Sequence, residues 1–239
     1  MMIDRESITR RNLPHWYRPD AAHFLTYRLK GSIPLKELQQ WRNAREQAKR
    51  RPENQSAARR EWLHDQFFRS YDSYLDHHPG LIDLTARSIA EMIRENLYFH
   101  NESLFHLMAY VVMNNHVHAL LQPIGDEFGP RPAGYFGGDE VDDRRSPLTR
   151  ICHSLKSYTA HQANRLLGRT GGFWQRESYD HWVRDEQELE RIVAYIDQNA
   201  VRAGLCRLAH EYRWPSAFDI FQRTGREGGS LWLPDWGVT

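Results

Sequence analysis

Hydrophobic and polar positions along the chain follow two different periods. In some segments apolar residues recur every three to four positions, which predicts a helix with one face on a core. Other short runs mix β-branched and aromatic residues, which predicts strands. The predicted helices are at residues 84–99, 148–167 and 186–199. The predicted strands are at residues 22–29, 104–113, 116–122 and 179–183.

The segments between these elements indicate how they connect. Asn114 and Asn115 separate two strands and tolerate the positive φ of a tight turn, so residues 104–122 are expected to form a central antiparallel hairpin. Residues 35–75 are rich in Arg, Glu, Gln and Ala and are interrupted at Pro52, which predicts a charged insertion of two helices that carries no chemistry. The order of elements predicts an α+β fold, a ferredoxin-like sandwich with helices packed on a central antiparallel sheet.

Length and composition add limits. The 239 residues suit one domain with insertions rather than two domains. Residues 124–146 contain Gly, Pro and acidic side chains and predict a flexible loop, while residues 206–239 predict a C-terminal tail over the surface. No apolar stretch reaches the roughly 20 residues of a membrane span. Residues 1–11 lack the apolar core of a secretory signal, so we expect a cytoplasmic protein without a membrane partner.

The candidate metal ligands are histidines, since the chain has only two cysteines. His116 and His118 are two residues apart on a predicted strand, so both imidazoles project from the same face and can chelate one ion. Val117 lies on the opposite, apolar face. The alternative is that the two histidines are ordinary polar residues on the exposed face of a hairpin.

A nucleophile and a third ligand are available on the predicted helix at residues 186–199. Tyr195 and Asn199 are four residues apart and therefore share one helix face. Two imidazoles and an amide oxygen leave open positions on Mg²⁺ or Mn²⁺, where phosphate oxygens can bind while Tyr195 attacks phosphorus. The alternative is that Tyr195 is a packing tyrosine, and its spacing alone does not identify it as the nucleophile. Tyr158 and Tyr179 are rival nucleophiles.

Five ordered groups of residues resemble a known family, the HUH single-tyrosine transposases, and within it the REP-associated tyrosine transposases. In chain order they are Arg11-Asn12-Leu13-Pro14-His15-Trp16; Tyr110-Val111-Val112-Met113-Asn114-Asn115-His116-Val117-His118; Leu155-Lys156-Ser157-Tyr158-Thr159-Ala160; Phe173-Trp174-Gln175-Arg176-Glu177 with Arg184-Asp185-Glu186; and Tyr195-Ile196-Asp197-Gln198-Asn199-Ala200-Val201-Arg202-Ala203-Gly204-Leu205.

The resemblance implies that His116 and His118 bind the metal, that Tyr195 is the nucleophile and that Asn199 sits beside the metal. It also implies single-stranded DNA substrates with a hairpin beside the cleavage point. Ala200 departs from the family, which usually has proline there, and the loop at residues 124–146 is longer than usual. Some single-tyrosine transposases build each site from two chains, whereas the REP-associated branch is expected to act as a monomer, so a monomer is favoured and a dimer stays open.

A basic segment at residues 144–170 carries six Arg or Lys residues and no Asp or Glu, which indicates a surface for phosphates. Trp174 with Gln175 offers a platform on which an unpaired base can stack. The alternatives are a helix that is basic for solubility and a buried tryptophan beside a glycine turn. The candidate DNA-binding residues are Arg150, Lys156, Ser157, Arg165, Trp174 and Gln175.

The resulting hypothesis is a metal-dependent enzyme that nicks and rejoins single-stranded DNA at hairpin-containing repeats through a 5′-phosphotyrosine intermediate. Two other classes stay open. One is a catalytically idle protein that binds DNA hairpins. The other is a metallohydrolase that uses the same histidines with water as nucleophile, for which the tyrosine would be dispensable.

Overall fold

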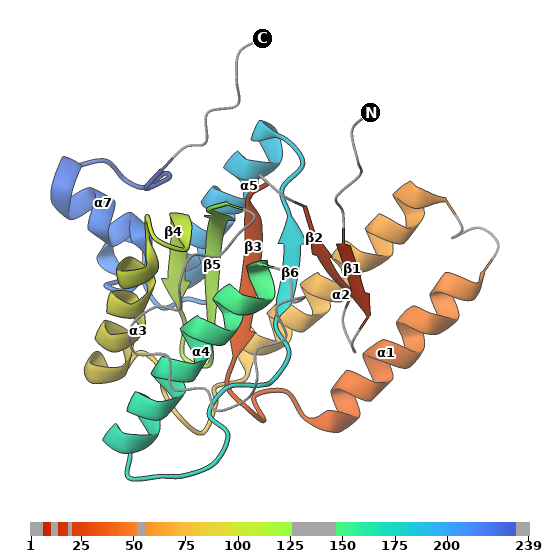
Figure 1. The fold of residues 1–239 in the computed structure, drawn as a ribbon, viewed down its shortest axis with the longest axis horizontal. Coiled ribbons are helices and arrows are strands. Elements are labelled where there is room, and N and C mark those ends of the chain that lie inside the picture. Colours follow the sequence, from red (N-terminus) through yellow and green to blue (C-terminus); the bar gives the residue numbers. More distant parts are fainter. Residues whose placement is uncertain (1–6, 11–13, 19–20, 52–55, 126–146, 233–239) are drawn as a thin grey trace.

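The computed structural model describes residues 7–10, 14–18, 21–51, 56–125 and 147–232. Its centre is a four-stranded antiparallel sheet in the order β4-β5-β3-β6. The strands are β3 (His23–Arg28), β4 (Phe105–Val112), β5 (His116–Pro123) and β6 (Tyr179–Trp182). Helices connect β3 to β4 and β5 to β6, so with this strand order the sheet has the ferredoxin-like arrangement (Figure 1). The predicted α+β class and sheet are confirmed.

Helices cover both faces of the sheet because side chains alternate along each strand. On one face, α3 (Arg87–His100) and α4 (Pro147–Leu166) pack on a core that includes Tyr27 and Val117. On the other face, α5 (Glu186–Asp197) and α2 (Ala57–His77) pack on a second core that includes Phe24 and Leu120. His116 and His118 lie on this second face, the same one that α2 and α5 cover.

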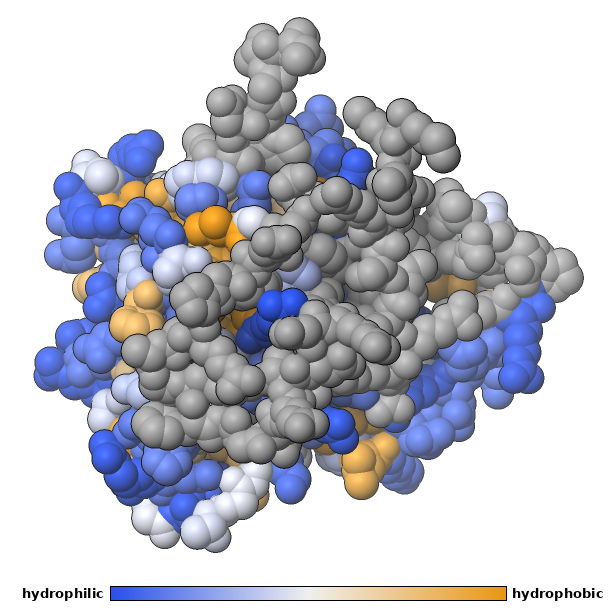
Figure 2. Space-filling model, in the orientation of Figure 1, coloured by the Kyte–Doolittle hydropathy of each residue, from blue (hydrophilic) through white to orange (hydrophobic). Residues whose placement is uncertain are grey.

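The predicted insertion is a pair of helices, α1 (Leu35–Arg50) and α2, that extends to one side of the sheet (Figure 1). The outer side of α1 is mainly hydrophilic (Figure 2). A small apolar cluster joins the two helices where they meet the sheet, formed by Ile33, Leu38, Tyr71 and Leu75. The C-terminal half of α2 is therefore docked on the body of the protein.

The β4–β5 hairpin is also confirmed, but its turn differs from the expectation. Among the described residues other than glycine, only Glu102 has a positive φ, so neither Asn114 nor Asn115 adopts the left-handed conformation. The turn closes through the Met113 N–H, which donates to the carbonyl of His116 at 2.9 Å. Asn115 has a side-chain role instead, described below.

Several elements at the ends of the chain were not predicted. A two-stranded sheet of β1 (Ser7–Arg10) and β2 (Pro14–Tyr17) precedes β3. The tail at residues 206–239 contains a short 3₁₀ helix (Ala209–Glu211) and α7 (Ser216–Thr224), which ends at Gly225 with φ 72°. Almost all of the predicted flexible loop at residues 124–146 lies outside the described residues.

The predicted helix at residues 186–199 is divided in two. It ends at Asp197, and a separate turn, α6 (Asn199–Arg202), follows Gln198. No helix in the described ranges has both the length and the apolar character needed to cross a membrane.

Candidate metal centre and its tyrosine

The two histidines are buried side by side on β5. His118 pairs with Thr26 of β3 and His116 pairs with Arg28 in the antiparallel register, so both imidazoles point toward the α2 and α5 face. Both side chains are 0% exposed, which rules out the alternative of polar residues on an open hairpin face. Burial lowers the pKa of His116 to about 3, with the neighbouring charge of His118 adding to the effect, so His116 is neutral at physiological pH. A neutral imidazole is the form that binds metal.

Hydrogen bonds on the far side of each ring orient the two histidines. Asn115 uses its Nδ2 to donate to the carbonyls of Leu75 at 2.9 Å and His78 at 2.7 Å, so its Oδ1 is left as the acceptor for His116 Nδ1 at 2.6 Å. His118 Nδ1 lies 2.8 Å from the hydroxyl of Thr26. The two Nε2 atoms therefore face each other, 3.1 Å apart. Such partners fix the ring orientation of metal-ligating histidines.

Asp72 on α2 completes a group of three ligand atoms. Its Oδ1 is 3.0 Å from His118 Nε2, and the carboxylate oxygen and both Nε2 atoms lie within 4.8 Å of one another. Burial acts to raise the pKa of Asp72, but the charge and hydrogen bond of His118 outweigh burial, so the net pKa is lowered and the carboxylate is ionised. The insertion was expected to carry no chemistry, but its second helix brings this carboxylate to both histidines.

A second carboxylate lies one helical turn later. Asp76 Oδ1 is 3.9 Å from His116 Nε2, and burial together with the charge of Asp72 raises the pKa of Asp76 to about 6. Asp76 also forms a long ion pair with Arg202, 3.8 Å between Oδ2 and the guanidinium nitrogen. The centre therefore has an acidic edge formed by one face of α2.

Tyr195 reaches the same point from α5. Its hydroxyl donates to Asp72 Oδ2, and its ring centroid is 5.7 Å from that of His118. The ring also meets Phe24 edge to face, 5.9 Å between centroids, which fixes the phenol over the sheet. The imidazoles, the carboxylate and the phenol all come from one chain, so one chain supplies every group of the centre.

Asn199, four residues after Tyr195, is 0% exposed. Its amide nitrogen and oxygen have no hydrogen-bond partner within the described residues, and the same is true of Asp76 Oδ1. Buried polar atoms of this kind are costly unless a ligand or water satisfies them. Two imidazole nitrogens with a carboxylate oxygen are a donor set that suits a divalent cation such as Mg²⁺ or Mn²⁺. The residues present therefore fit the implied metal.

The candidate DNA-binding residues of α4 lie on the other face of the sheet from the histidines. Lys156 is engaged by the protein itself, because its Nζ donates to the carbonyls of Gln175 at 2.9 Å and Arg176 at 3.2 Å. Ser157 and Arg150 are partly exposed and Arg165 is exposed. Face and burial thus separate this group from the metal centre.

Trp174 is placed as a core residue. It is 7% exposed, its indole N–H donates to Thr159 Oγ1 at 2.9 Å, and its ring meets Tyr27 edge to face. An unpaired base has no free ring face to stack on in this arrangement, which corrects the expected platform. Gln175 uses its backbone N–H to bond to the carbonyl of Arg28, while its side chain is partly exposed.

Sequence reasoning did not identify Asp72, Thr26 or Asn115 as part of the centre. Asp72 has a recognisable signature, since it occupies a core-facing position of α2 between the apolar residues Phe68 and Leu75. A carboxylate within an apolar stripe requires a partner on the face that it meets. Thr26 carries no comparable pattern and is found only through the register of β3 with β5.

Comparison with known proteins gives two matches of the same kind. A REP-associated tyrosine transposase of Haemophilus influenzae is 26% identical over 134 residues, which are 56% of this chain and 67% of that protein. A solved structure of a REP-associated tyrosine transposase bound to a REP hairpin has a TM-score of 0.50 and 15% identity, and the match covers 98% of this chain and 92% of the other, which shows likeness of fold. No family model matches the chain. The resemblance read from the motifs is confirmed: this chain is similar to REP-associated tyrosine transposases, to one in sequence and to another in fold.

Proposed function

We propose that this protein is a metal-dependent transposase that nicks and rejoins single-stranded DNA beside a hairpin, with Tyr195 as nucleophile. The observation that carries the proposal is the convergence of Tyr195, Asp72 and the two histidines at one point. The Tyr195 hydroxyl bonds to the same carboxylate that lies 3.0 Å from His118 Nε2. One phosphodiester can therefore meet the nucleophile and the metal ligands together.

Each residue of the centre has a separate role in the proposed reaction. His116, His118 and Asp72 would hold the cation, and we assign the buried amide of Asn199, which has no partner within the described residues, as a further ligand. The bound cation supplies polarisation of the phosphodiester oxygens. Asp72 accepts the hydrogen bond of the phenol and so aims its oxygen, and Phe24 fixes the ring. The Tyr195 oxygen forms a bond to phosphorus and loses its proton while the bond from phosphorus to the 3′-oxygen breaks and that oxygen takes up a proton.

A hairpin substrate is supported by the structural comparison, since the matched structure is of a REP-associated tyrosine transposase bound to a REP hairpin. The presence of every catalytic group in one chain supports action as a monomer. On α4, the exposed or partly exposed side chains Arg150, Ser157 and Arg165 are candidates for contacts to the stem, and the partly exposed Gln175 is a candidate for a flanking base.

The test is formation of a covalent protein–DNA adduct. The protein is incubated with Mn²⁺ and a single strand that carries a hairpin, and a denaturation-resistant adduct is expected for the parent and not for Tyr195→Phe. Tyr158→Phe is the matched control, because Tyr158 is exposed on α4, on the other face of the sheet. An adduct with Tyr195→Phe contradicts the choice of nucleophile.

The two remaining classes give different results in the same assay. Strand cutting that survives Tyr195→Phe without any adduct indicates water as the nucleophile. Hairpin binding without cutting or adduct, in the parent protein and with Mn²⁺ present, indicates a binding protein.

A further inference from the structure

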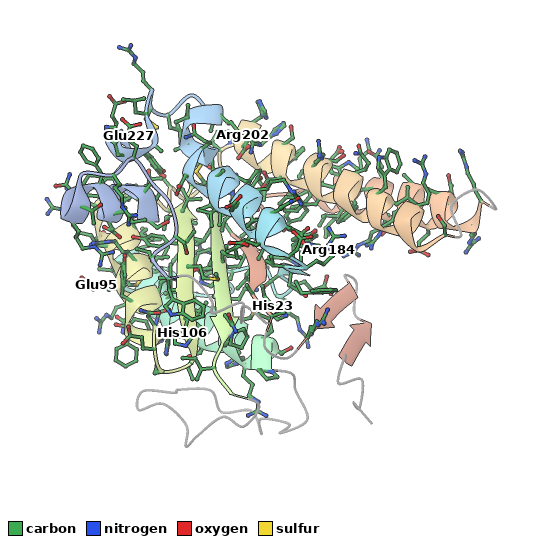
Figure 3. All side chains as sticks on the ribbon, turned by 90° about the horizontal axis from the view of Figure 1, so that it is seen from above. His23, Glu95, His106, Arg184, Arg202 and Glu227 are labelled. Atoms are coloured by element: carbon green, nitrogen blue, oxygen red, sulfur yellow. The ribbon has the colours of Figure 1, made fainter. Side chains whose placement is uncertain are left out.

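Arg202 places a guanidinium group against the face of the proposed nucleophile. Its Cζ lies 4.5 Å from the centroid of the Tyr195 ring, and one of its terminal nitrogens is 3.8 Å from Asp76 Oδ2. Figure 3 shows Arg202 beside α2, at the opposite end of α5 from Arg184. None of the roles assigned to the metal centre above uses the guanidinium of Arg202.

The backbone of α6 fixes where Arg202 stands. Asn199 and Ala200, at the start of this turn, are fully buried, and the Arg202 N–H donates to the carbonyl of Gln198 at 2.9 Å. The chain then leaves through Gly204, whose φ of 72° is in the left-handed region. The Arg202 Cα is therefore anchored by a buried turn while its side chain extends toward solvent.

The guanidinium itself is only loosely held. The Arg202 side chain is 46% exposed, and its contacts in the described part of the chain are the ring of Tyr195 and the long ion pair with Asp76. A guanidinium has five N–H donors in a planar fork that matches two oxygens of a phosphate. The donors of Arg202 are thus only partly engaged, beside the phenol of Tyr195.

The charges of the centre favour a cation at this position. Asp72 and Asp76 contribute two carboxylates, which a divalent cation would offset, and the incoming phosphodiester adds a further negative charge that grows as the phenol oxygen attacks. Arg202 borders both the phenol and the carboxylate edge. Its charge is therefore placed where the reaction gathers negative charge.

We infer that Arg202 binds the scissile phosphodiester and, after cleavage, the phosphate carried by Tyr195. The inference rests on the proposed function and extends it to the group that recognises the reacting phosphate. Arginines that contact a transferring phosphoryl group accelerate the transfer by about 10³- to 10⁵-fold, and single donors to a developing oxyanion by about 10²- to 10³-fold. Because Arg202 is half exposed, we expect about 10²-fold.

The test measures adduct formation in a single turnover with Mn²⁺ and the hairpin strand. Arg202→Ala is expected to slow adduct formation about 10²-fold, and Arg202→Lys, which keeps the charge but loses the fork, to recover part of the rate. Arg226→Ala removes the same charge from an exposed site beyond α7 and is expected to keep the parent rate. Mn²⁺ affinity, followed by titration calorimetry, is expected to agree within about twofold among the four proteins.

A second substrate separates phosphate binding from support of the tyrosine ring. With a methylphosphonate at the scissile position, which removes the phosphate charge, the rates of the parent and of Arg202→Ala are expected to converge. A defect that stays the same on this substrate, or a loss of Mn²⁺ affinity in Arg202→Ala, assigns Arg202 a structural role and overturns the inference.

The two levels of proposal fail in different ways. If the parent forms an adduct and Arg202→Ala forms it at an equal rate, the inference alone is overturned. If the parent itself forms no adduct with the hairpin strand, the proposed function is overturned and the inference with it.

Discussion

Asn115 is the residue whose removal tests the proposed metal centre most directly. Its side chain makes three hydrogen bonds, two to the carbonyls of Leu75 and His78 at the end of α2 and one to His116 Nδ1. At about 1 kcal/mol for each bond, Asn115→Ala is expected to lower the free energy of unfolding by about 3 kcal/mol. Loss of the partner that orients a metal-ligating histidine is expected to weaken Mn²⁺ binding by about 10- to 100-fold.

Asn115→Asp separates these two effects. Aspartate keeps an oxygen acceptor for His116 Nδ1 but removes both N–H donors to α2. We therefore expect the free energy of unfolding to fall by at least about 2 kcal/mol, since two bonds are lost, while Mn²⁺ affinity stays within about tenfold of the parent. Urea denaturation without metal measures the first quantity, and titration of the folded protein with Mn²⁺ measures the second.

Asn114→Ala is the control, because Asn114 occupies the same turn and is only partly buried. It should change neither quantity appreciably. The reasoning is refuted if Asn115→Ala binds Mn²⁺ as tightly as the parent, because His116 would then need no partner on Nδ1. It is equally refuted if Asn115→Asp loses affinity as fully as Asn115→Ala, because the acceptor oxygen would then be irrelevant.

Three other predictions concern residues away from the centre. Burial, followed by the charge of Arg28, lowers the pKa of Lys156 to about 8, so from about pH 8 to 10 the unfolded chain holds a proton that the folded chain has lost. In this range the free energy of unfolding of the parent should rise with pH relative to that of Lys156→Met, by at most about 1.4 kcal/mol per pH unit. Urea denaturation of both proteins measures the difference. An equal slope in both proteins contradicts this. Trp174→Phe should lower the free energy of unfolding by about 1 kcal/mol, because the hydrogen bond of the indole is lost, and should leave the affinity for the hairpin unchanged in a filter-binding assay. Weaker hairpin binding at unchanged stability would restore the stacking role. Asp219→Ala leaves Arg94 without the carboxylate that it meets at 2.7 Å and should lower the free energy of unfolding by about 3 kcal/mol. Thermal denaturation measures the change, and a loss under about 1 kcal/mol contradicts the prediction.

The sequence predicts the central sheet well because its signals are local. The apolar face of β5 and the short break before it suffice to indicate the β4–β5 hairpin, and the helical stripes of α3, α4 and α5 agree with the structure within a few residues at each end. The elements that were missed at the ends of the chain are short. The strands β1 and β2 have four residues each, and α7 has nine, too few for a clear period in the sequence.

The candidate site was predicted only in part, for a different reason. His116, His118 and Tyr195 carry recognisable spacing and belong to motifs that the family shares. Asp72 lies 44 positions before His116 in a segment without such a motif, and only the docking of α2 on the sheet brings the two together. Pairing across a fold depends on the packing of whole elements, which a pattern within one element does not contain.

Trp174 illustrates the opposite error. Trp174 was a candidate platform for an unpaired base, with burial beside the glycine turn as the alternative. The structure shows the alternative: Leu29, just after β3, forms a β-bridge with Trp174, whose side chain lies in the core. The indole N–H then finds Thr159 on α4. Whether an aromatic residue faces solvent or core is decided by the neighbouring backbone, and that backbone is distant in sequence.

The origin of the ligands in two separate parts of the fold has a thermodynamic consequence. A cation held by Asp72 and the two histidines would cross-link the α1–α2 hairpin to the N-terminal end of β5. Because a ligand stabilises the state that binds it by RT ln(1 + [L]/Kd), opening of the hairpin and release of the cation are then one coupled equilibrium. Amide hydrogens in the second half of α2 should exchange more slowly with deuterium as Mn²⁺ is added, whereas those of α3, on the far side of the sheet, should keep their rates.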